Sequence, residues 1–402
     1  MQERPISTEL KAVSEPLARR VFLHRTLATV TAGALAPALS MVQAACAPVS
    51  APAPTGDAAA PATSGKPEWE QQWDEWVRAA KQEGQLTIGI GPVTGHEKTL
   101  AAFEEAFPGI KVDNQVFQGA GIYAPKVTQE RQGGLYAWDV AIFPFQTMLN
   151  TLKPAGAFDP IRPVIIRPDV TNNNAWIDGF EDGFRDNEKK WVYVFGEFSH
   201  PGFAANRDIV KDNLKSVKDL LDPKWKGRIL LSDPRGGSVS WWFAIHQNLG
   251  VEVLKQLLVD QQPSFTRDHR QITEALVRGT FPIALLGVKS FLAELQSQGL
   301  GKNVGYLDLP EARVVVAASS CLWLMNKAPH PNAARVFVNW MLTQQGQNAW
   351  NSTNIGNSRR NDVPPVDLDF VKVPGANIPN ASREDTLKAQ ADVQKLVLDW
   401  VR

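Results

Sequence analysis

The chain has 402 residues, of which 44% are hydrophobic and 21% charged, and its 42 basic and 42 acidic side chains give a formal net charge of zero. This length exceeds that of one ordinary hydrophobic core, so we expect two lobes. The even charge balance argues against nucleic acid as a partner. The two cysteines lie in unlike surroundings, so a structural disulfide is not expected.

The first 46 residues have the features of an export signal. Arg19 and Arg20 form a twin-arginine core, which a short apolar stretch and small residues follow. The arginine pair favours export of the folded protein. Cys46 stands after two alanines and is a candidate lipidation site, although Gln43 replaces the usual Leu or Val. Ordinary cleavage nearby, with Cys46 incidental, is the alternative.

Residues 47–66 are rich in Pro and Ala and predict a flexible tether. Behind a lipidated cysteine, such a tether would let a folded domain stand off from a membrane. We therefore expect an exported protein at the cell surface or in the periplasm, with a lipid anchor as its membrane contact.

Alternating helices and strands begin near residue 67. Trp69, Trp73 and Trp76 recur at helical spacing, which predicts an amphipathic helix whose tryptophans pack against a core. Strands are then predicted over residues 85–91, 110–117 and 139–143, with helices over 96–107 and after residue 121. This order indicates half of an open parallel sheet.

The second half of the chain continues the α/β pattern. Further strands are predicted over residues 191–195 and 281–286, and another ends at residue 233. One long buried strand is predicted over 314–325. Further helices are predicted over residues 214–221, 239–249, 251–259, 272–278, 288–298, 332–343 and 383–401.

Several stretches in this order carry a family resemblance. They are Ala-Phe-Pro-Gly-Ile-Lys-Val from Ala106, Trp-Asp-Val-Ala-Ile-Phe from Trp138, Leu-Asp-Pro-Lys-Trp-Lys-Gly-Arg-Ile from Leu221, and Ala-Pro-His-Pro-Asn-Ala-Ala-Arg-Val-Phe-Val-Asn-Trp from Ala328. With this order and spacing, the chain resembles an extracellular (periplasmic) solute-binding protein of an ABC importer. The branch that it resembles includes iron(III), thiamine, polyamine and phosphonate binders.

The resemblance implies an α/β, type II periplasmic-binding-protein fold, in which two lobes, each an open mixed sheet flanked by helices, are hinged by crossing strands. Lobe one would take residues 67–197 and 322–354, and lobe two residues 198–321 and 355–402. It also implies a monomer that captures a small solute and delivers it to a membrane permease. No cofactor and no catalysis are expected.

Candidate ligand contacts in lobe one lie after the predicted strands, because open α/β sheets bind ligands at the carboxyl ends of their strands. Thr94 and Glu97 have capping-box spacing around Gly95, which would leave helix amides free for an anion; a mere helix cap is the alternative. Corresponding places after the second and third strands are occupied by Gly119, Gly121, Tyr123 and Phe143.

In lobe two, the turn from Asp233 to Ser238 is the strongest candidate. Gly237 allows a close backbone approach, Ser238 can cap a helix or donate to a ligand, and Arg235 can pair with a carboxylate or phosphate.

Three aromatic or basic side chains complete the candidates. Trp241 and Trp242 are adjacent on a helix, so we expect Trp241 to wall the cleft, with burial of both as the alternative. Arg359 at a crossing strand is the last candidate, with ordinary surface exposure as the alternative.

A metal site is not expected. The iron(III) binders of this branch carry adjacent tyrosines where this chain reads Gly-Val-Lys-Ser-Phe from Gly287, so phenolate ligands are lacking. The histidines and cysteines show no metal-ligand spacing. The glycine turns and Arg235 favour an anionic or zwitterionic organic solute.

A secreted hydrolase or another enzyme on an α/β fold is the alternative function. Gly237-Ser-Val-Ser-Trp241 only partly resembles a serine nucleophile elbow, because the final glycine is absent. The glycines at 89, 91 and 95 do not match dinucleotide-binding spacing.

Overall fold

The structure is a computed structural model that describes residues 65–401 apart from 237–238, 318, 354–355 and 373–376. The predicted export signal, Cys46 and almost the whole tether lie outside the described residues, as do Gly237 and Ser238. The described residues belong to one compact unit. Within them, no helix has the length and apolar character needed to cross a membrane.

The lobe-one sheet has five strands in the order β2-β1-β3-β12-β4. Parallel pairing joins β1 (Gln85–Ile90) to β2 (Lys111–Val116) and to β3 (Val140–Ile142). Antiparallel pairing joins β12 (Cys321–Leu324) to β3 and to β4 (Val192–Val194). The connections within the first three strands are α2 (His96–Ala106) and α3 (Ala120–Gln132), as the sequence pattern predicts.

The amphipathic helix near residue 67 is confirmed as α1 (Glu68–Glu83). It packs against α9 (Pro331–Met341), which belongs to the far end of the sequence. Trp73 and Trp76 are partly buried against the lobe-one core, and the Trp73 ring meets that of Phe107 edge-on at 5.9 Å. Trp73 and Trp76 of α1 are therefore packing residues.

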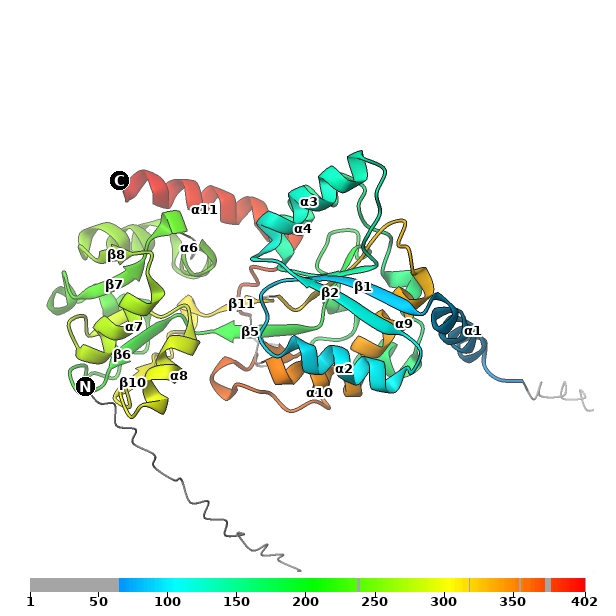
Figure 1. The fold of residues 1–402 in the computed structure, drawn as a ribbon. Helices are drawn as coiled ribbons and strands as arrows, with labels where there is room; N and C mark the ends of the chain where they lie inside the picture. The colour runs from blue at the N-terminus through cyan, green and yellow to red at the C-terminus, as the bar shows by residue number, and fades with distance from the viewer. Residues whose placement is uncertain (1–64, 237–238, 318, 354–355, 373–376, 402) are drawn as a thin grey trace, which may run out of the picture. The chain divides into compact units, whose positions relative to one another are not determined.

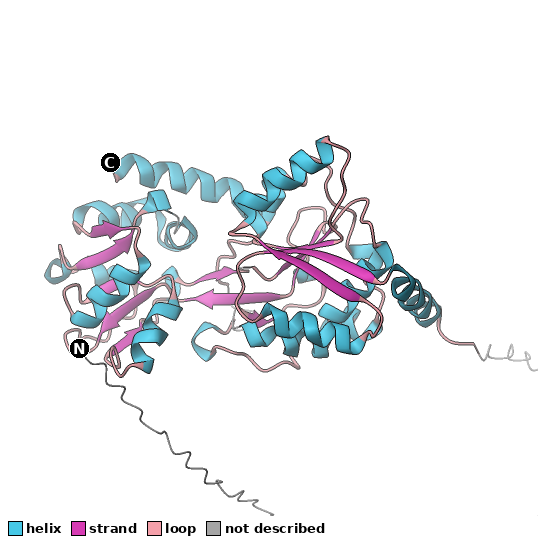
Figure 2. Cartoon of the chain, viewed as in Figure 1, coloured by secondary structure: helices cyan, strands magenta, loops and turns pink. Residues whose placement is uncertain are grey.

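The lobe-two sheet also has five strands, in the order β10-β6-β9-β7-β8. The parallel members are β7 (Ile229–Ser232), β8 (Ser264–Thr266) and β9 (Ile283–Leu285), while β6 (Phe203–Asn206) runs antiparallel to β9 and β10 (Val304–Tyr306). Helices α6 (Val239–Lys255), α7 (His269–Arg278), α8 (Lys289–Ser297) and α11 (Leu387–Trp400) accompany this sheet (Figure 2). The two helices predicted over 239–259 meet at a kink at Gly250, where φ is 83°.

A three-stranded hinge sheet joins the lobes (Figure 1). Its central strand β5 (Gly196–His200) pairs antiparallel with β11 (Val314–Val316) and β13 (Asn357–Ser358). The single long strand predicted over 314–325 is wrong, because β11 pairs in the hinge sheet while β12 pairs in the lobe-one sheet. The lobe boundaries given above stay a prediction.

The remaining regular elements are short. They are α4 (Phe145–Thr151), α5 (Pro168–Thr171), α10 (Gln344–Trp350), and several single turns of 3-10 helix, one of which (Glu384–Thr386) precedes α11. The predicted C-terminal helix therefore starts four residues later than its sequence pattern indicated.

Candidate functional site

Three loops converge at the carboxyl edge of the lobe-one sheet. The backbone N–H of Gly91, just after β1, donates to the carbonyl of Ile142 at 3.1 Å. A Cβ added at Gly91 would stand 3.4 Å from Ser319 Oγ and 3.6 Å from Phe143 Cδ1. The segments after β1, after β3 and before β12 thus meet at one point, as the edge rule predicts.

The capping box predicted at the start of α2 is wrong. The helix begins at His96, and its cap residue is Gly95, with φ of 83° and no side-chain cap. A Cβ at Gly95 would lie 2.9 Å from the carbonyl oxygen of Ser352, so a glycine is needed there. Thr94 is exposed beside this turn, and Glu97 Oε1 lies 3.6 Å from His96 Nδ1.

Two of the predicted lobe-one contacts are core residues. Tyr123 and Phe143 are both fully buried, with stacked rings 4.4 Å apart, and burial raises the pKa of Tyr123. This burial contradicts the predicted contact with a solute. Gly89 is the sequence feature that could have indicated this burial, because a Cβ there would stand 2.4 Å from the Tyr123 ring. The strand glycine makes room for an inward-pointing aromatic side chain.

The two glycines near the start of α3 are in open positions. Gly119 is its N-cap residue, with φ of 115°, and Gly121 is exposed in its first turn. A Cβ added at either would meet nothing within 4 Å. Both therefore remain compatible with the predicted ligand contact.

The lobe-two turn holds what we call the edge cluster: Asp233, Arg235 and Arg267. Arg235 donates from Nε and Nη2 to the Asp233 carboxylate, each at 2.8 Å. Arg267 Nε donates to Asp233 Oδ2 at 3.2 Å. The carboxylate is 8% exposed, whereas the two guanidinium side chains are 51% and 61% exposed. Hydrogen bonding from Arg235 lowers the pKa of Asp233 to about 2, so the cluster holds two positive charges against one negative charge.

Arg267 was missed by the sequence reasoning. It follows β8, which is parallel to β7 and adjacent to it, so both carboxyl ends lie at the same edge of the sheet. The three residues of β8 are too few for a period-2 pattern to show. Arg235 lies in the turn that the sequence singled out. Its bidentate partner in the structure is the Asp233 carboxylate.

Trp241 lies between the lobe-two sheet and the hinge. Its ring is partly buried against Gly202 and Gly287, where an added Cβ would come within 2.6 Å and 3.2 Å of ring atoms. It meets the His200 ring edge-on at 5.0 Å. Trp242 is fully buried in the lobe-two core. The adjacent tryptophans thus face different surroundings, and Trp241 stands at the carboxyl end of β9.

His200, on β5, was not among the predicted residues. Its Nδ1 accepts a hydrogen bond from the Gly202 N–H at 3.0 Å, which places the ring proton on Nε2. Burial, with the charges of Arg313 and Lys289, lowers the pKa of His200 to about 3. Nε2 is enclosed and has no hydrogen-bond partner among the residues that the structure describes. The ring is therefore a neutral donor within the hinge.

Arg359 does not face an opening. It is fully buried, and it donates to the carbonyls of Val194 and Ile177 at 3.1 and 2.9 Å and to Asp182 Oδ2 at 3.0 Å. The prediction that it reaches the cleft is wrong, because its side chain, just after β13, lies in the protein interior. No local sequence pattern distinguishes it from the neighbouring Arg360.

Arg359 belongs to what we call the hinge cluster, four cations and four carboxylates: Arg185, Arg359, Lys372, Arg383, Asp178, Asp182, Glu197 and Asp385. Arg185 Nη2 lies 2.8 Å from Glu197 Oε2, and both side chains are almost completely buried. Burial raises the pKa of Glu197, but the nearby charges of Arg185, Arg359 and Lys372 outweigh this and hold the pKa below its usual value.

One groove brings both lobes and the C-terminal helix together. It has a volume of about 470 Å³ and is lined by Gln146 of α4, Val239 of α6 and Gln390, Ala391, Gln394, Lys395, Leu398 and Asp399 of α11. Gln146 follows β3, and Val239 follows the turn that carries the edge cluster. The groove therefore has a lining residue near each sheet edge, although the edge cluster itself is not among the lining residues.

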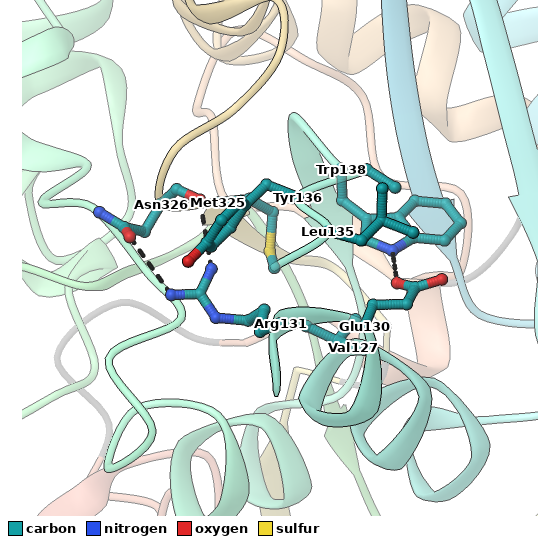
Figure 3. A pocket seen from close by; sticks show the side chains of 9 residues that line it. Val127, Glu130, Arg131, Leu135, Tyr136, Trp138, Met325 and Asn326 are labelled. Carbon is teal, nitrogen blue, oxygen red and sulfur yellow. Dashed lines mark hydrogen bonds between the residues drawn. The ribbon is translucent and has the colours of Figure 1, made fainter. Parts of the chain in front are cut away.

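The pocket in Figure 3 is different in kind. It has a volume of about 10 Å³, enough for about one water molecule, between Arg131, Tyr136 and Asn326. The Arg131 guanidinium donates to the carbonyl and side-chain oxygens of Asn326 at 3.3 and 3.2 Å. This pocket is too small for an organic solute.

Metal ligands are not gathered in the described part of the chain, where no group of three or more His, Cys, Asp or Glu is placed to hold an ion. Two of the four tyrosines, Tyr123 and Tyr193, are buried in the lobe-one core. Tyr306 is partly buried, and its pKa is raised by burial. No tyrosine stands at Gly287, where β9 ends.

Solved structures with this fold include three binding proteins. Iron-bound HitA from Pseudomonas aeruginosa is 20% identical, with a TM-score of 0.55 over 78% of this chain and 99% of its own. The ferric binding protein from Campylobacter jejuni is 18% identical, with a TM-score of 0.58 and coverage of 78% and 99%. A putative extracellular solute-binding protein from Bordetella parapertussis is 15% identical, with a TM-score of 0.62 and coverage of 79% and 99%. The likeness confirms the two-lobed α/β fold.

No curated protein matches the chain. A family model does: that of the bacterial extracellular solute-binding proteins, over residues 98–361, which is more than half of the chain. The match includes the carboxyl ends of β2, β3 and β7, together with β5 and β13, and it confirms the resemblance drawn from the sequence. The chain belongs to the bacterial extracellular solute-binding protein family.

Proposed function

We propose that the solute is a small organic anion or zwitterion, held between the carboxyl edges of the two sheets. The observation that carries this proposal is the surplus positive charge of the edge cluster. Asp233 neutralises one of two guanidinium groups, and both arginines are more than half exposed. Among the described residues, Arg267 makes one hydrogen bond, through Nε. Its remaining donors suit a carboxylate, phosphate or phosphonate.

Family membership gives the wider setting. The protein is the solute-binding component of an ABC importer and acts outside the cytoplasm, in a family of binding proteins rather than enzymes. A solute that contacts both lobes only when they are close together shifts the population toward the closed form. We propose a monomer, anchored through a lipid on Cys46, whose closed form docks on a membrane permease.

Iron(III) is the cargo named for two of the similar structures. This chain offers a weaker set of ligands, because Gly287 to Phe291 contains no tyrosine and Tyr123 and Tyr193 are core residues. Hard trivalent cations need anionic oxygen ligands. The exposed guanidinium groups of the edge cluster instead favour negative charge.

A thermal-shift screen of the purified protein tests the proposal. The panel contains carboxylates, phosphonates, polyamines, thiamine, sugars and iron(III). At a hundred times its Kd, a ligand adds about 2.7 kcal/mol to the free energy of unfolding, which raises the melting temperature measurably. We expect a shift with carboxylates or phosphonates that falls in Arg267→Ala. A shift with polyamines or iron(III) alone would contradict the proposed solute class.

A further inference from the structure

The C-terminal helix α11 contacts both lobes. Val393 and Val397 are buried in the lobe-two core, and α11 packs along α6 (Figure 1). At its start, Leu387 packs against the lobe-one core. Just before the helix, Glu384 accepts from Lys153 Nζ at 2.9 Å, which ties this segment to the end of α4. The helix therefore contacts both of the lobes between which a solute would bind.

The face of α11 between these attachments forms most of the wall of the 470 Å³ groove. Three of the lining residues are glutamines: Gln146 on α4, and Gln390 and Gln394 on α11. The amide of Gln390 is fixed, because its Nε2 donates to the Ala381 carbonyl at 3.0 Å and to Thr386 Oγ1 at 2.9 Å. An amide-lined groove suits a solute that makes hydrogen bonds.

Gln394 has one satisfied and one unsatisfied end. Its Nε2 donates to the Pro234 carbonyl at 2.7 Å, in the turn that carries Arg235. Its Oε1 is enclosed and has no hydrogen-bond partner among the described residues. Because the Pro234 carbonyl can only accept, this bond sets the orientation of the amide. Oε1 is then a positioned acceptor, and a buried acceptor is costly to leave unpaired.

We infer that α11 is a third wall of the solute site and that Gln394 Oε1 accepts a hydrogen bond from the bound solute. The inference rests on the proposed function, since the acid group of the solute would meet Arg235 in the adjoining turn and Arg267 in the loop after β8. The solute then carries a donor beside its acid group. A hydroxyl and an ammonium both supply that donor, so the substrate class is a small hydroxy acid or amino acid.

Calorimetric titration of the full chain with four acids tests this assignment. Succinate carries no donor at neutral pH, malate adds one hydroxyl, tartrate adds two, and aspartate adds an ammonium. We expect malate, tartrate or aspartate to bind about 3- to 10-fold more tightly than succinate, the range of one net hydrogen bond. Malate against aspartate distinguishes the hydroxyl from the ammonium.

The variant Gln394→Ala should abolish this preference and leave succinate affinity within about 2-fold. Gln394→Glu keeps the side-chain length and should favour aspartate over malate, because a carboxylate accepts best from a cation. The matched control is Lys388→Ala on the same helix, where the side chain is 87% exposed; it should leave all four affinities unchanged. Melting temperatures of the variants show whether each has folded.

Two results would overturn the inference. One is equal affinity for all four acids in the unmodified protein. The other is a preference that Gln394→Ala leaves intact. If none of the acids binds, the proposed acid class fails, and uncharged erythritol becomes the probe. Erythritol binding that Gln394→Ala weakens keeps α11 as a wall of the site, whereas binding that the variant leaves unchanged, or no binding at all, contradicts it.

Discussion

The hinge cluster and the edge cluster both pair arginines with carboxylates, yet they do so in opposite ways. Around Arg359, four cations meet four carboxylates, and the central side chains of Arg185, Arg359 and Glu197 are at most 3% exposed. Around Asp233, two half-exposed arginines share one carboxylate. The first arrangement is neutral and closed, and the second is positive and open.

The difference shows why an arginine in a predicted cleft is ambiguous. A buried guanidinium must have its charge matched inside the protein. In Arg359 both Nη atoms already donate hydrogen bonds and Nε lies 3.8 Å from Glu197 Oε2, so little remains for a ligand. An exposed guanidinium with a surplus charge keeps donors for a solute. We therefore retain Arg235 for the site, add Arg267, and assign Arg359 to the hinge.

The largest expected effect comes from unbalancing the hinge cluster. Glu197→Ala leaves Arg185 and Arg359 buried with Asp182 as their remaining shared carboxylate, and we expect the free energy of unfolding to fall by about 3–5 kcal/mol. Urea unfolding measures the loss. The control is Asp392→Ala, at a carboxylate 63% exposed that pairs with Lys388, where the change should stay below about 1 kcal/mol. Similar losses in both variants would show that the hinge cluster is no more than a surface network.

The second expected effect sharpens the contrast within β5 itself. Glu197 stays charged because cations surround it, whereas His200 stays neutral, with a pKa of about 3 instead of its ordinary 6.5. Above pH 6.5 the folded and unfolded states both hold this ring neutral. Between pH 6.5 and 3 only the unfolded state takes up the proton. As the pH is lowered through this range, this group therefore reduces the free energy of unfolding by up to about 1.4 kcal/mol per pH unit.

His200→Gln, which keeps an acceptor for the Gly202 N–H, should remove that contribution to the acid slope. Urea unfolding at pH 7, 5.5 and 4.5 in both proteins measures the difference. Parallel slopes would mean that the histidine is reached by solvent in the folded protein.

The smallest effect on stability is expected in the edge cluster. Arg267→Ala should change the free energy of unfolding by less than about 1 kcal/mol, because the side chain is 61% exposed and Arg235 still pairs with Asp233. The affinity for an anionic solute should nevertheless fall about 10-fold, since one charge-assisted hydrogen bond is lost. Arg267→Lys should recover part of it. If the variant loses stability but keeps its affinity for the solute, Arg267 has a structural role like that of Arg359.

Much of the fold followed from hydrophobic periodicity. The order of β1, α2, β2, α3 and β3 and the family resemblance were both available from the sequence. The carboxyl-edge rule drew attention to the turns after β1 and after β7, because strand ends are marked by glycine and proline.

What the sequence could not give was pairing at long range. The bond between Arg359 and Asp182 joins residues that are 177 positions apart, and no local pattern reports whether such a partner exists. Tyr123 and Phe143 look like site residues at the ends of strands, but their partners turn them inward. The role of α11 was hidden for the same reason, since the Pro234 carbonyl that Gln394 contacts is distant in sequence.

The late arrival of β12 has a consequence for synthesis. This strand lies between β3 and β4, and its Trp323 donates to the Phe143 carbonyl across 180 positions of sequence. During translation, β3 and β4 therefore wait with unpaired edges until residue 324 has left the ribosome. Closing so long a loop is slow, and open strand edges invite aggregation in the meantime. The amino-terminal half of the chain therefore exposes two strand edges for as long as β12 is missing.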